Sequence, residues 1–350
     1  MARTTGGGKP RVTVYTVADR AGVSVATVSR VLQEPHRVKE ATRIRVEAAM
    51  DELNYVPYGA ARSLAFNQHE AHGLVLPELG GPYYSELLMG YESVAAAAGY
   101  SVVLVLSEGK DDLGVALRRL AGKVDGIVLM GAAEVPDRIL AALRARLPVL
   151  GLTRNDRADL ESFATENRSS AEELTRHLLA HGRQRLVFVG RPESAIDVRE
   201  RHEGFIAAHD DRAVLPAVPA DLRENEGIRV ADLVISGEID ADALVCANDE
   251  LALAIMHRLM AHDVVVPRDI AIVGWDDVMT ARYVRPGLTT VAQPVRDLGA
   301  RAAARMHDLI LGHTDTPEQH TLPTTVVIRQ SCGCAAGDAA ARLTADDTKE

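Results

Sequence analysis

The sequence is poor in cysteine and in aromatic residues, and it has no long apolar run. Three cysteines among 350 residues supply no disulfide framework. No stretch is apolar for long enough to span a bilayer, and the first ten residues lack the apolar core of a signal peptide. We therefore expect a cytoplasmic protein with no membrane partner.

The short motifs of common enzyme classes are also missing. The chain has no GxSxG elbow, no Walker phosphate loop, no HExxH and no GxGxxG fingerprint. Cys332-Gly-Cys334 has no nearby His or Cys in the sequence to complete a zinc set, so incidental thiols are favoured over a redox pair. We predict no catalytic residues, no metal and no cofactor.

Charge divides the chain into a basic head and an acidic body. Residues 1–66 hold ten Lys and Arg against six Asp and Glu, whereas the rest of the chain holds 29 against 43. Basic charge confined to one segment is the electrostatic footprint expected for binding to phosphates. The head is therefore the candidate nucleic-acid-binding domain.

The pattern of the head predicts a helix-turn-helix. A short helix ends at Gly22, and Ser24 is placed to N-cap a second helix over Val25–Gln33. A third amphipathic helix is expected over Thr42–Leu53, where apolar residues recur at helical spacing and can cover the first two. Such a unit can be a plain three-helix bundle, but the basic charge favours DNA binding.

The body alternates short apolar runs with helical patterns. Strands are expected at 73–77, 100–106, 125–130, 148–152, 185–190, 243–247 and 269–274, and helices at 84–98, 112–121, 136–146, 171–181, 198–208, 228–236, 250–262 and 298–311. This alternation predicts parallel sheets covered by helices on both faces, with two such lobes. Ligands of such sheets bind beyond the carboxyl ends of the strands.

A nearly continuous motif runs through the head. Its residues are Val17-Ala18, Ala21-Gly22-Val23-Ser24, Thr27-Val28-Ser29-Arg30-Val31-Leu32, Glu47-Ala48-Ala49, Leu53-Asn54-Tyr55 and Pro57. The body adds Arg201-x-x-Gly204-Phe205, Ala247-Asn248-Asp249, Val273-Gly274-Trp275-Asp276-Asp277, Leu288-Thr289-Thr290-Val291 and Gln293-Pro294. Together these residues closely resemble the lac/gal repressor (LacI/GalR) family of transcriptional regulators.

The resemblance implies an all-α helix-turn-helix head with a hinge helix, followed by a periplasmic-binding-protein-like core of two doubly wound parallel-sheet lobes. The expected divisions are a disordered arm at 1–11, the DNA-binding domain at 12–57, the hinge helix and linker at 58–71, the two-lobed effector-binding and dimerisation domain at 72–331 and a disordered tail at 332–350. The chain would cross between the lobes near 165, 291 and 322.

For the head, the resemblance implies DNA contacts from Thr13, Tyr15, Ser24, Val25, Ala26, Thr27, Ser29, Arg30, Lys39, Tyr55, Arg62 and Leu64. Val25 and Ala26 are apolar and suit a thymine methyl group, whereas Arg30 can donate two hydrogen bonds to guanine. Leu64 would act as a wedge in the minor groove. Two heads on a homodimer imply a pseudo-palindromic operator in double-stranded DNA.

For the body, the resemblance implies effector contacts from Tyr83, Tyr84, Glu166, Arg201, Asn248, Trp275, Asp276 and Gln293. Several follow predicted strands, where Asn and Asp are common helix caps, so capping is the alternative role. Glu166 stands where relatives usually have Asp.

Arg201, Asn248 and Asp276 suit the hydroxyls of a sugar. The purine-responsive branch has another Arg at the position of Ala195, so a purine or nucleoside is the second choice. The expected function is a repressor released by its effector, the alternatives being a ligand that acts as corepressor and a binding protein without a DNA role.

Overall fold

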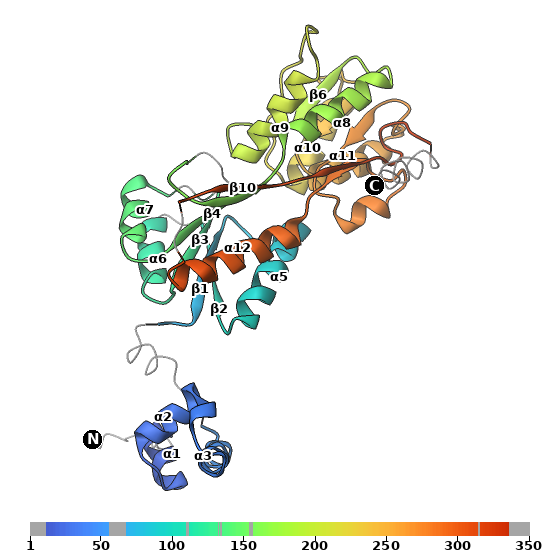
Figure 1. Ribbon diagram of the computed structural model, residues 1–350. Helices are drawn as coiled ribbons and strands as arrows, with labels where there is room; N and C mark the ends of the chain where they lie inside the picture. Colours follow the sequence, from blue (N-terminus) through green and yellow to red (C-terminus); the bar gives the residue numbers. More distant parts are fainter. Residues whose placement is uncertain are drawn as a thin grey trace, which may run out of the picture. The chain divides into compact units, whose positions relative to one another are not determined.

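The computed structural model describes residues 12–55, 68–109, 112–131, 133, 135–153, 157–313 and 316–335, and the statements below concern these residues. The chain forms two compact units, residues 1–69 and residues 70–350 (Figure 1). The expected arm at 1–11, the hinge helix with Arg62 and Leu64, and positions 336–350 of the expected tail lie outside the described residues.

The first unit consists of three α-helices around a small apolar core. The helices are α1 (Val14–Ala21), α2 (Val25–Gln33) and α3 (Glu40–Leu53), with a 3-10 turn, η1 (Pro35–Arg37), before α3. Gly22 ends α1 with a φ of 62°, a conformation that favours glycine. Ser24 then caps α2 by accepting the amide of Thr27 at 3.1 Å, as predicted.

The second unit begins with lobe 1, a six-stranded parallel sheet in the order β10-β5-β4-β3-β1-β2. Its strands are β1 (Ala71–Leu76), β2 (Ser101–Leu106), β3 (Gly126–Met130), β4 (Val149–Leu152), β5 (Ser162–Thr165) and β10 (Gln319–Leu322). Side chains alternate between the two faces, so Leu74 packs under α5 (Gly81–Ala97) and α12 (Val295–Ile310), while Val75 packs under α6 (Leu113–Leu120) and α7 (Asp137–Arg144).

Helices α5 and α12 pack against each other at glycines (Figure 1). A Cβ at Gly90 would lie only 1.9 Å from the carbonyl oxygen of Arg296. A Cβ at Gly299 would likewise lie 2.3 Å from the carbonyl oxygen of Leu87. Only glycine at these two positions permits this close approach of the helix backbones.

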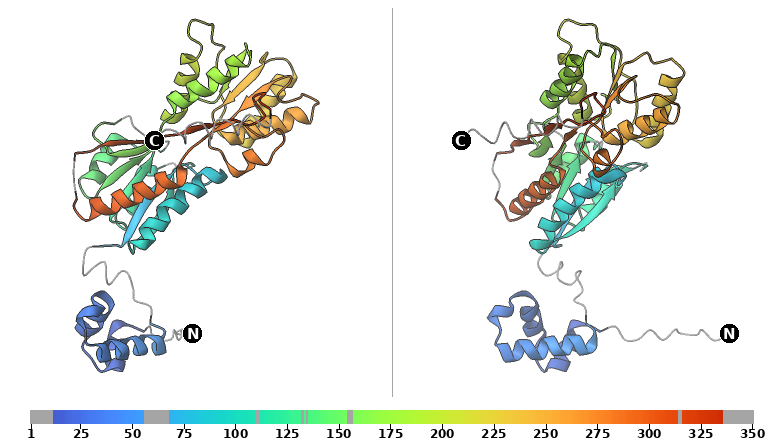
Figure 2. Two further views of the ribbon diagram at one scale, coloured as in Figure 1. Left: turned by 45° about the vertical axis from the view of Figure 1, so that its right-hand side comes forward. Right: turned by 90° about the vertical axis from the view of Figure 1, so that its right-hand side faces the viewer.

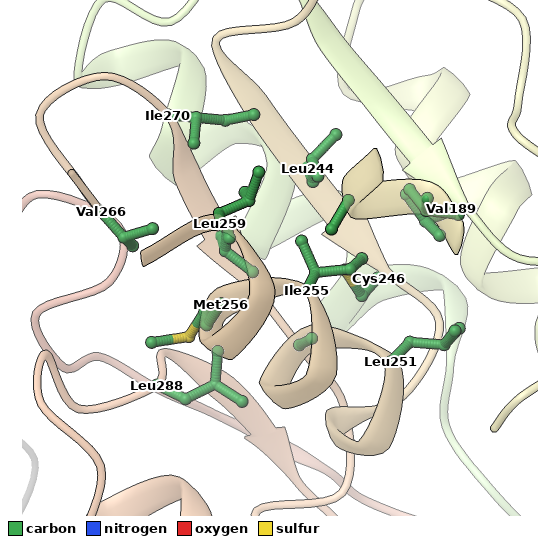
Figure 3. Packing of buried hydrophobic residues seen from close by; sticks show 14 of the residues in the cluster. Val189, Leu244, Cys246, Leu251, Ile255, Met256, Leu259, Val266, Ile270 and Leu288 are labelled. Carbon is green, nitrogen blue, oxygen red and sulfur yellow. The ribbon is translucent and has the colours of Figure 1, made fainter. Parts of the chain in front are cut away.

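Lobe 2 is a smaller parallel sheet in the order β6-β7-β8. The strands are β6 (Leu186–Val189), β7 (Ala243–Cys246) and β8 (Ala271–Val273), followed by the turn η2 (Met279–Arg282). Helices α8 (Arg168–Ala180) and α9 (Ile196–Ala207) cover one face, and α10 (Glu224–Ile235) and α11 (Asp249–Met260) cover the other. On the second face, Leu244 and Cys246 of β7 pack against Ile255 and other residues of α11 (Figure 3).

Three segments connect the lobes (Figure 2). The chain passes from β5 to α8, from β9 (Thr290–Ala292) to α12, and from β10 to β11 (Thr325–Val327). β9 and β11 pair antiparallel, so the core is not built from parallel strands alone. The sequence did not predict β5, β9, β10 or β11, because these short, threonine-containing strands lack a continuous apolar run.

The start of the expected tail is ordered. Residues 330–333 form a turn, and Cys332 within it is fully buried in the core under α8. The amide of Ile272 in β8 donates to the carbonyl oxygen of Ser331 at 3.0 Å. The segment expected to be a disordered tail therefore begins with a residue packed in lobe 2, since Cys332 is buried in its core, whereas Gly333 and Ala335 are exposed.

Candidate functional site

Helix α2 has one face in the core of the head and one face exposed. Val28 and Val31 are buried, whereas Ala26 and Arg30 are exposed one turn apart on the other side. Ser24 is exposed as well, while its oxygen caps the helix. An exposed helix face that begins at a capped N-terminus is the geometry that major-groove reading requires.

Charge pairing within residues 12–55 leaves some cations unpaired. This segment holds six Lys and Arg and six Asp and Glu, so the basic excess of the head comes from residues that flank it. Arg20 pairs with Glu52, but Arg30 and Lys39 have no ion pair within the described residues. These unpaired cations are available to phosphates or base edges.

The remaining predicted DNA contacts occupy several positions around the head. Tyr15 is 68% exposed at the start of α1, and Thr13 caps that helix. Val25 and Tyr55 are half-buried against the core of the head. Thr27 and Ser29 are half-buried on α2.

A cavity of about 510 Å³ lies between the two lobes of the body. Lobe 1 lines it with the start of α5 and the loop before it, and lobe 2 lines it from the segments that follow its strands. The volume is within the usual range for small-molecule sites. Five predicted effector residues line the cavity, namely Tyr83, Tyr84, Arg201, Asn248 and Asp276.

Tyr83 and Tyr84 form the aromatic wall on the lobe 1 side. Their rings are arranged edge to face, with centroids 5.5 Å apart. Burial raises the pKa of both hydroxyls well above the usual value, and the carboxylates of Asp197 and Asp276 add to the rise. Both hydroxyls therefore remain protonated at neutral pH and can donate hydrogen bonds.

Arg201 of α9 is fixed by three hydrogen bonds and an aromatic ring. Its guanidinium donates to the side-chain oxygen of Asn167 at 2.9 Å, to the carbonyl oxygen of Ala247 at 2.7 Å and to Asp197 at 3.2 Å. The Cζ atom also lies 4.7 Å from the centroid of the Trp275 ring. Two of the five guanidinium N–H groups remain for a ligand in the cavity.

Asp276 reaches the cavity from a strained turn after β8. Its φ of 119° is unusual for a residue with a side chain. The side-chain NH₂ group of Gln293 donates to the carboxylate of Asp276 at 2.6 Å. The hydroxyl of Thr165 in turn donates to the side-chain oxygen of Gln293 at 2.5 Å. Burial raises the pKa of Asp276 to about 7, although Arg201 and Gln293 lower it.

Asn248 combines a cap with a place on the cavity wall. Its side-chain oxygen accepts the amide of Leu251 at 3.0 Å, which caps α11, and its nitrogen donates to the carbonyl oxygen of Leu222 at 3.2 Å. One N–H of the amide remains for a ligand. Capping and ligand contact are therefore compatible at this residue.

Carboxylates outnumber cations around the cavity. The acidic lining residues are Glu78, Asp197, Glu224, Glu250 and Asp276. Arg201 and His257 are the other titratable lining residues besides the tyrosines. Glu78, Glu224 and Glu250 could not be predicted from the sequence, because they belong to no recognisable motif and meet only where the fold joins both lobes. Such a wall presents mainly hydrogen-bond acceptors.

Comparison with known proteins agrees with this division of the chain. Residues 13–58 match the model described as bacterial regulatory proteins, lacI family, and residues 175–332 match a periplasmic binding protein-like domain. The chain is 32% identical over 331 residues to the ribose operon repressor of Escherichia coli, covering 91% of this chain and 98% of that protein. The chain belongs to the lacI family.

Solved structures of this family show the same fold. The regulator matches the lac repressor dimer bound to operator and the anti-inducer ONPF with a TM-score of 0.80 and 30% identity, covering 92% of this chain and 99% of that chain. It also matches a complex of the transcriptional regulator CelR with cellobiose, with a TM-score of 0.68 and 26% identity over 92% of this chain and 100% of that chain. The predicted fold class and family are confirmed, and the protein is a DNA-binding transcriptional regulator.

Three predicted effector residues of the regulator do not line the cavity. Glu166 accepts the amides of Ser169 and Ser170 at 2.5 and 3.0 Å, so it caps α8. Trp275 is buried behind Arg201, and Gln293 is behind Asp276. Glu166 and Gln293 are therefore engaged by hydrogen bonds within the protein, whereas the indole N–H of Trp275 is buried without a hydrogen-bond partner among the described residues, and direct effector contacts at these three positions stay a prediction.

Asp249, next to Asn248, has a structural role in the regulator. It is fully buried and accepts hydrogen bonds from the Thr290 hydroxyl at 2.6 Å and from the Val278 amide at 2.9 Å. Burial raises its pKa above the usual value, and the charge of Asp276 adds to this rise. Asp249 therefore connects the start of α11 to β9.

The described residues of the regulator contain no helix that is both long and apolar enough to cross a membrane.

Proposed function

We propose that this regulator is a repressor that binds a pseudo-palindromic operator as a homodimer and is released by an uncharged sugar. It acts in the cytoplasm as a binding protein without catalysis. The observation that carries the proposal is the inter-lobe cavity, with tyrosines on one side and Arg201, Asn248 and Asp276 on the other. The lac repressor dimer bound to operator and the CelR–cellobiose complex support the DNA, dimer and sugar parts of the proposal.

The charge of the cavity favours a neutral polyol. Sugar hydroxyls can donate to Glu250, Asp276 and the other carboxylates and can accept from Arg201 and Asn248. An anionic ligand such as a phosphate or a carboxylate would face five acidic side chains and one arginine, so electrostatic repulsion would weaken its binding. The aromatic pair Tyr83–Tyr84 supplies the flat apolar surface that a sugar ring can contact.

The cavity also explains how ligand binding can change DNA binding. A ligand that touches Tyr84 and Asp276 bridges the two lobes, so it favours one arrangement of the lobes over another. The hydrogen-bond chain Thr165–Gln293–Asp276 runs from the end of β5 to the cavity through the crossover that follows β9. Differential affinity for two lobe arrangements provides the coupling free energy between effector and operator.

The test is fluorescence anisotropy of the purified protein on short duplexes from the DNA upstream of its own gene. We expect tight, salt-sensitive binding to one pseudo-palindrome, released by one neutral sugar among a panel of sugars, sugar phosphates, purines and nucleosides. Release of the operator by a purine would show that the effector is a purine and not a sugar. Tighter operator binding in the presence of a ligand would show that this ligand is a corepressor. If no duplex from a genome-wide fragment pool is bound specifically, the proposal of a sequence-specific repressor is refuted.

Two variants separate effector binding from folding. Tyr84→Phe removes a hydroxyl at the cavity and keeps the ring, so release should need about ten times more sugar while operator binding is unchanged. Tyr283→Phe is the matched control, because it removes the same hydroxyl from an exposed tyrosine of lobe 2 that does not line the cavity. Equal loss of sugar response in both variants would contradict the assignment of the cavity.

A further inference from the structure

Two histidines and two cysteines meet at the surface of lobe 2. The Nε2 atom of His177 lies 3.3 Å from Sγ of Cys332 and 3.5 Å from Sγ of Cys334. The Nε2 atom of His181 lies 3.3 Å from Sγ of Cys334. Donor atoms of His177, Cys332 and Cys334 all lie within 4.8 Å of one another.

The fold brings these residues together from distant parts of the chain. His177 is in the last turns of α8 and His181 caps its end, four residues on, so both rings face the same side of the helix. The cysteines follow β11 in the segment 331–335, and Gly333 between them has a φ of 113°. This glycine conformation lets both thiols turn toward α8.

The spacing of His177, Cys332 and Cys334 fits three corners of a tetrahedral metal site, and His181, in contact with Cys334, is placed beside them as the fourth ligand. With metal–sulfur and metal–nitrogen bonds of about 2.3 and 2.0 Å for zinc, adjacent sulfur and nitrogen ligands are roughly 3.5 Å apart. The distances from His177 Nε2 to the two sulfurs are 3.3 and 3.5 Å, and the distance from His181 Nε2 to Cys334 Sγ is 3.3 Å. Two imidazoles and two thiolates form a Cys₂His₂ set, which zinc prefers.

A neighbouring hydroxyl supports the buried sulfur. Thr289 donates its hydroxyl proton to Sγ of Cys332 at 3.2 Å, and the amide of Arg329 fixes that hydroxyl by donating to it at 2.8 Å. A hydrogen bond to a ligating thiolate stabilises its negative charge and its orientation. His181 is exposed and Cys334 half-buried, so an ion from solvent can reach the cluster.

We propose that His177, His181, Cys332 and Cys334 bind one Zn²⁺ ion as a structural site. Binding releases the two thiol protons to solvent, and the neutral imidazoles coordinate through Nε2. All four positions are filled by protein, so the site is closed to substrate. The ion would join the segment 331–335 to α8 and stabilise lobe 2. This site is separate from the effector cavity, so its test does not depend on the proposed sugar.

The test measures zinc binding to the full chain, purified with reduced thiols and dialysed against excess zinc and then buffer. We expect one zinc per chain, loss of the ion on chelation, and a fall in the thermal midpoint of the body when zinc is removed. Cobalt loaded in its place should give the thiolate charge-transfer band and the d–d bands of a tetrahedral S₂N₂ site.

Surface variants avoid the risk of unfolding. His181→Gln and Cys334→Ser each remove one ligand that is not fully buried, and each should weaken zinc affinity by tenfold or more with the apo thermal midpoint unchanged. The matched control is His262→Gln, an exposed histidine on lobe 2 outside the cluster. Fewer than 0.2 zinc per chain in the reduced wild type would overturn the site, as would equal zinc content in the variants. Protection of the two thiols by a Cys332–Cys334 disulfide that persists in reductant would overturn it too.

Discussion

Replacing Asp276 by Asn should stabilise the free protein at high pH and weaken its response to effector. Burial raises the pKa of this carboxyl from its usual value of 3.8 to about 7. Between these values the folded protein holds a proton that the unfolded chain has lost, so the stability of the wild type falls as the pH rises. Above pH 7 the whole difference, about 4 kcal/mol at most, opposes folding.

Asparagine keeps the shape of the side chain and the acceptor for Gln293 but carries no charge. The thermal midpoint of Asp276→Asn should therefore exceed that of the wild type by several degrees at pH 8, about 10 °C at most, and by much less at pH 5. Scanning calorimetry of the full chain at both pH values measures this difference. A gap of the same size at both pH values would refute burial of the charge as its cause.

The adjacent residue provides the control. Asp277 forms ion pairs with Arg329 and with Arg282, whose guanidinium lies 3.4 Å away. Asp277→Asn should therefore lower the thermal midpoint by a similar amount at both pH values. At pH 8 the thermal midpoint should therefore rise in Asp276→Asn and fall in Asp277→Asn, which distinguishes the cavity carboxylate from the ion-paired one.

Effector binding supplies a second readout for Asp276. The ionised carboxylate is the better acceptor for a sugar hydroxyl, so the sugar affinity of the wild type should rise between pH 6 and pH 8. Asp276→Asn should bind sugar about ten times more weakly or worse, without that rise. A variant that gains stability and keeps its full sugar affinity would remove Asp276 from the proposed effector site.

Three further changes test other contacts. Glu166→Ala removes the cap of α8, which costs about 1 kcal/mol, so the thermal midpoint of the body should fall by about 2–4 °C while the sugar affinity stays the same. A loss of sugar affinity would show that Glu166 contacts the ligand. Gly90→Ala should destabilise the body by about 1–3 kcal/mol, because its Cβ would meet the carbonyl of Arg296, whereas Gly122→Ala, with its nearest atom at 3.6 Å, should be tolerated in the same calorimetry. Ser24→Ala removes an N-cap that stabilises α2 by about 1 kcal/mol, so hydrogen exchange of the α2 amides should become about fivefold faster. Unchanged exchange would show that Ser24 does not stabilise the helix as a cap.

The head could be predicted in detail because its signals are local. Gly22 and Ser24 define the turn through their own backbone preferences, and the helices they bound span only a few residues. The body strands with continuous apolar runs, such as β3 and β6, were predicted for the same reason. β9 and β11 were missed, because a three-residue strand is specified by its partner across the crossover and not by its own composition.

The sequence by itself determined which residues follow the strands, and parallel strands end at one edge, so Asn248 and Asp276 were found. It could not determine which side chains face the cavity, because the direction of a side chain depends on contacts made elsewhere. Glu166 turns to the amides of α8, and Trp275 packs behind Arg201.

Only the tertiary structure placed His177 beside Cys332 and the carboxylates of two lobes around one cavity. Contacts between residues so far apart in the sequence leave no periodicity or spacing for a sequence pattern to show. The entropy lost when these long loops close is offset by the burial of apolar surface in the whole core, and no local sequence pattern reports that balance.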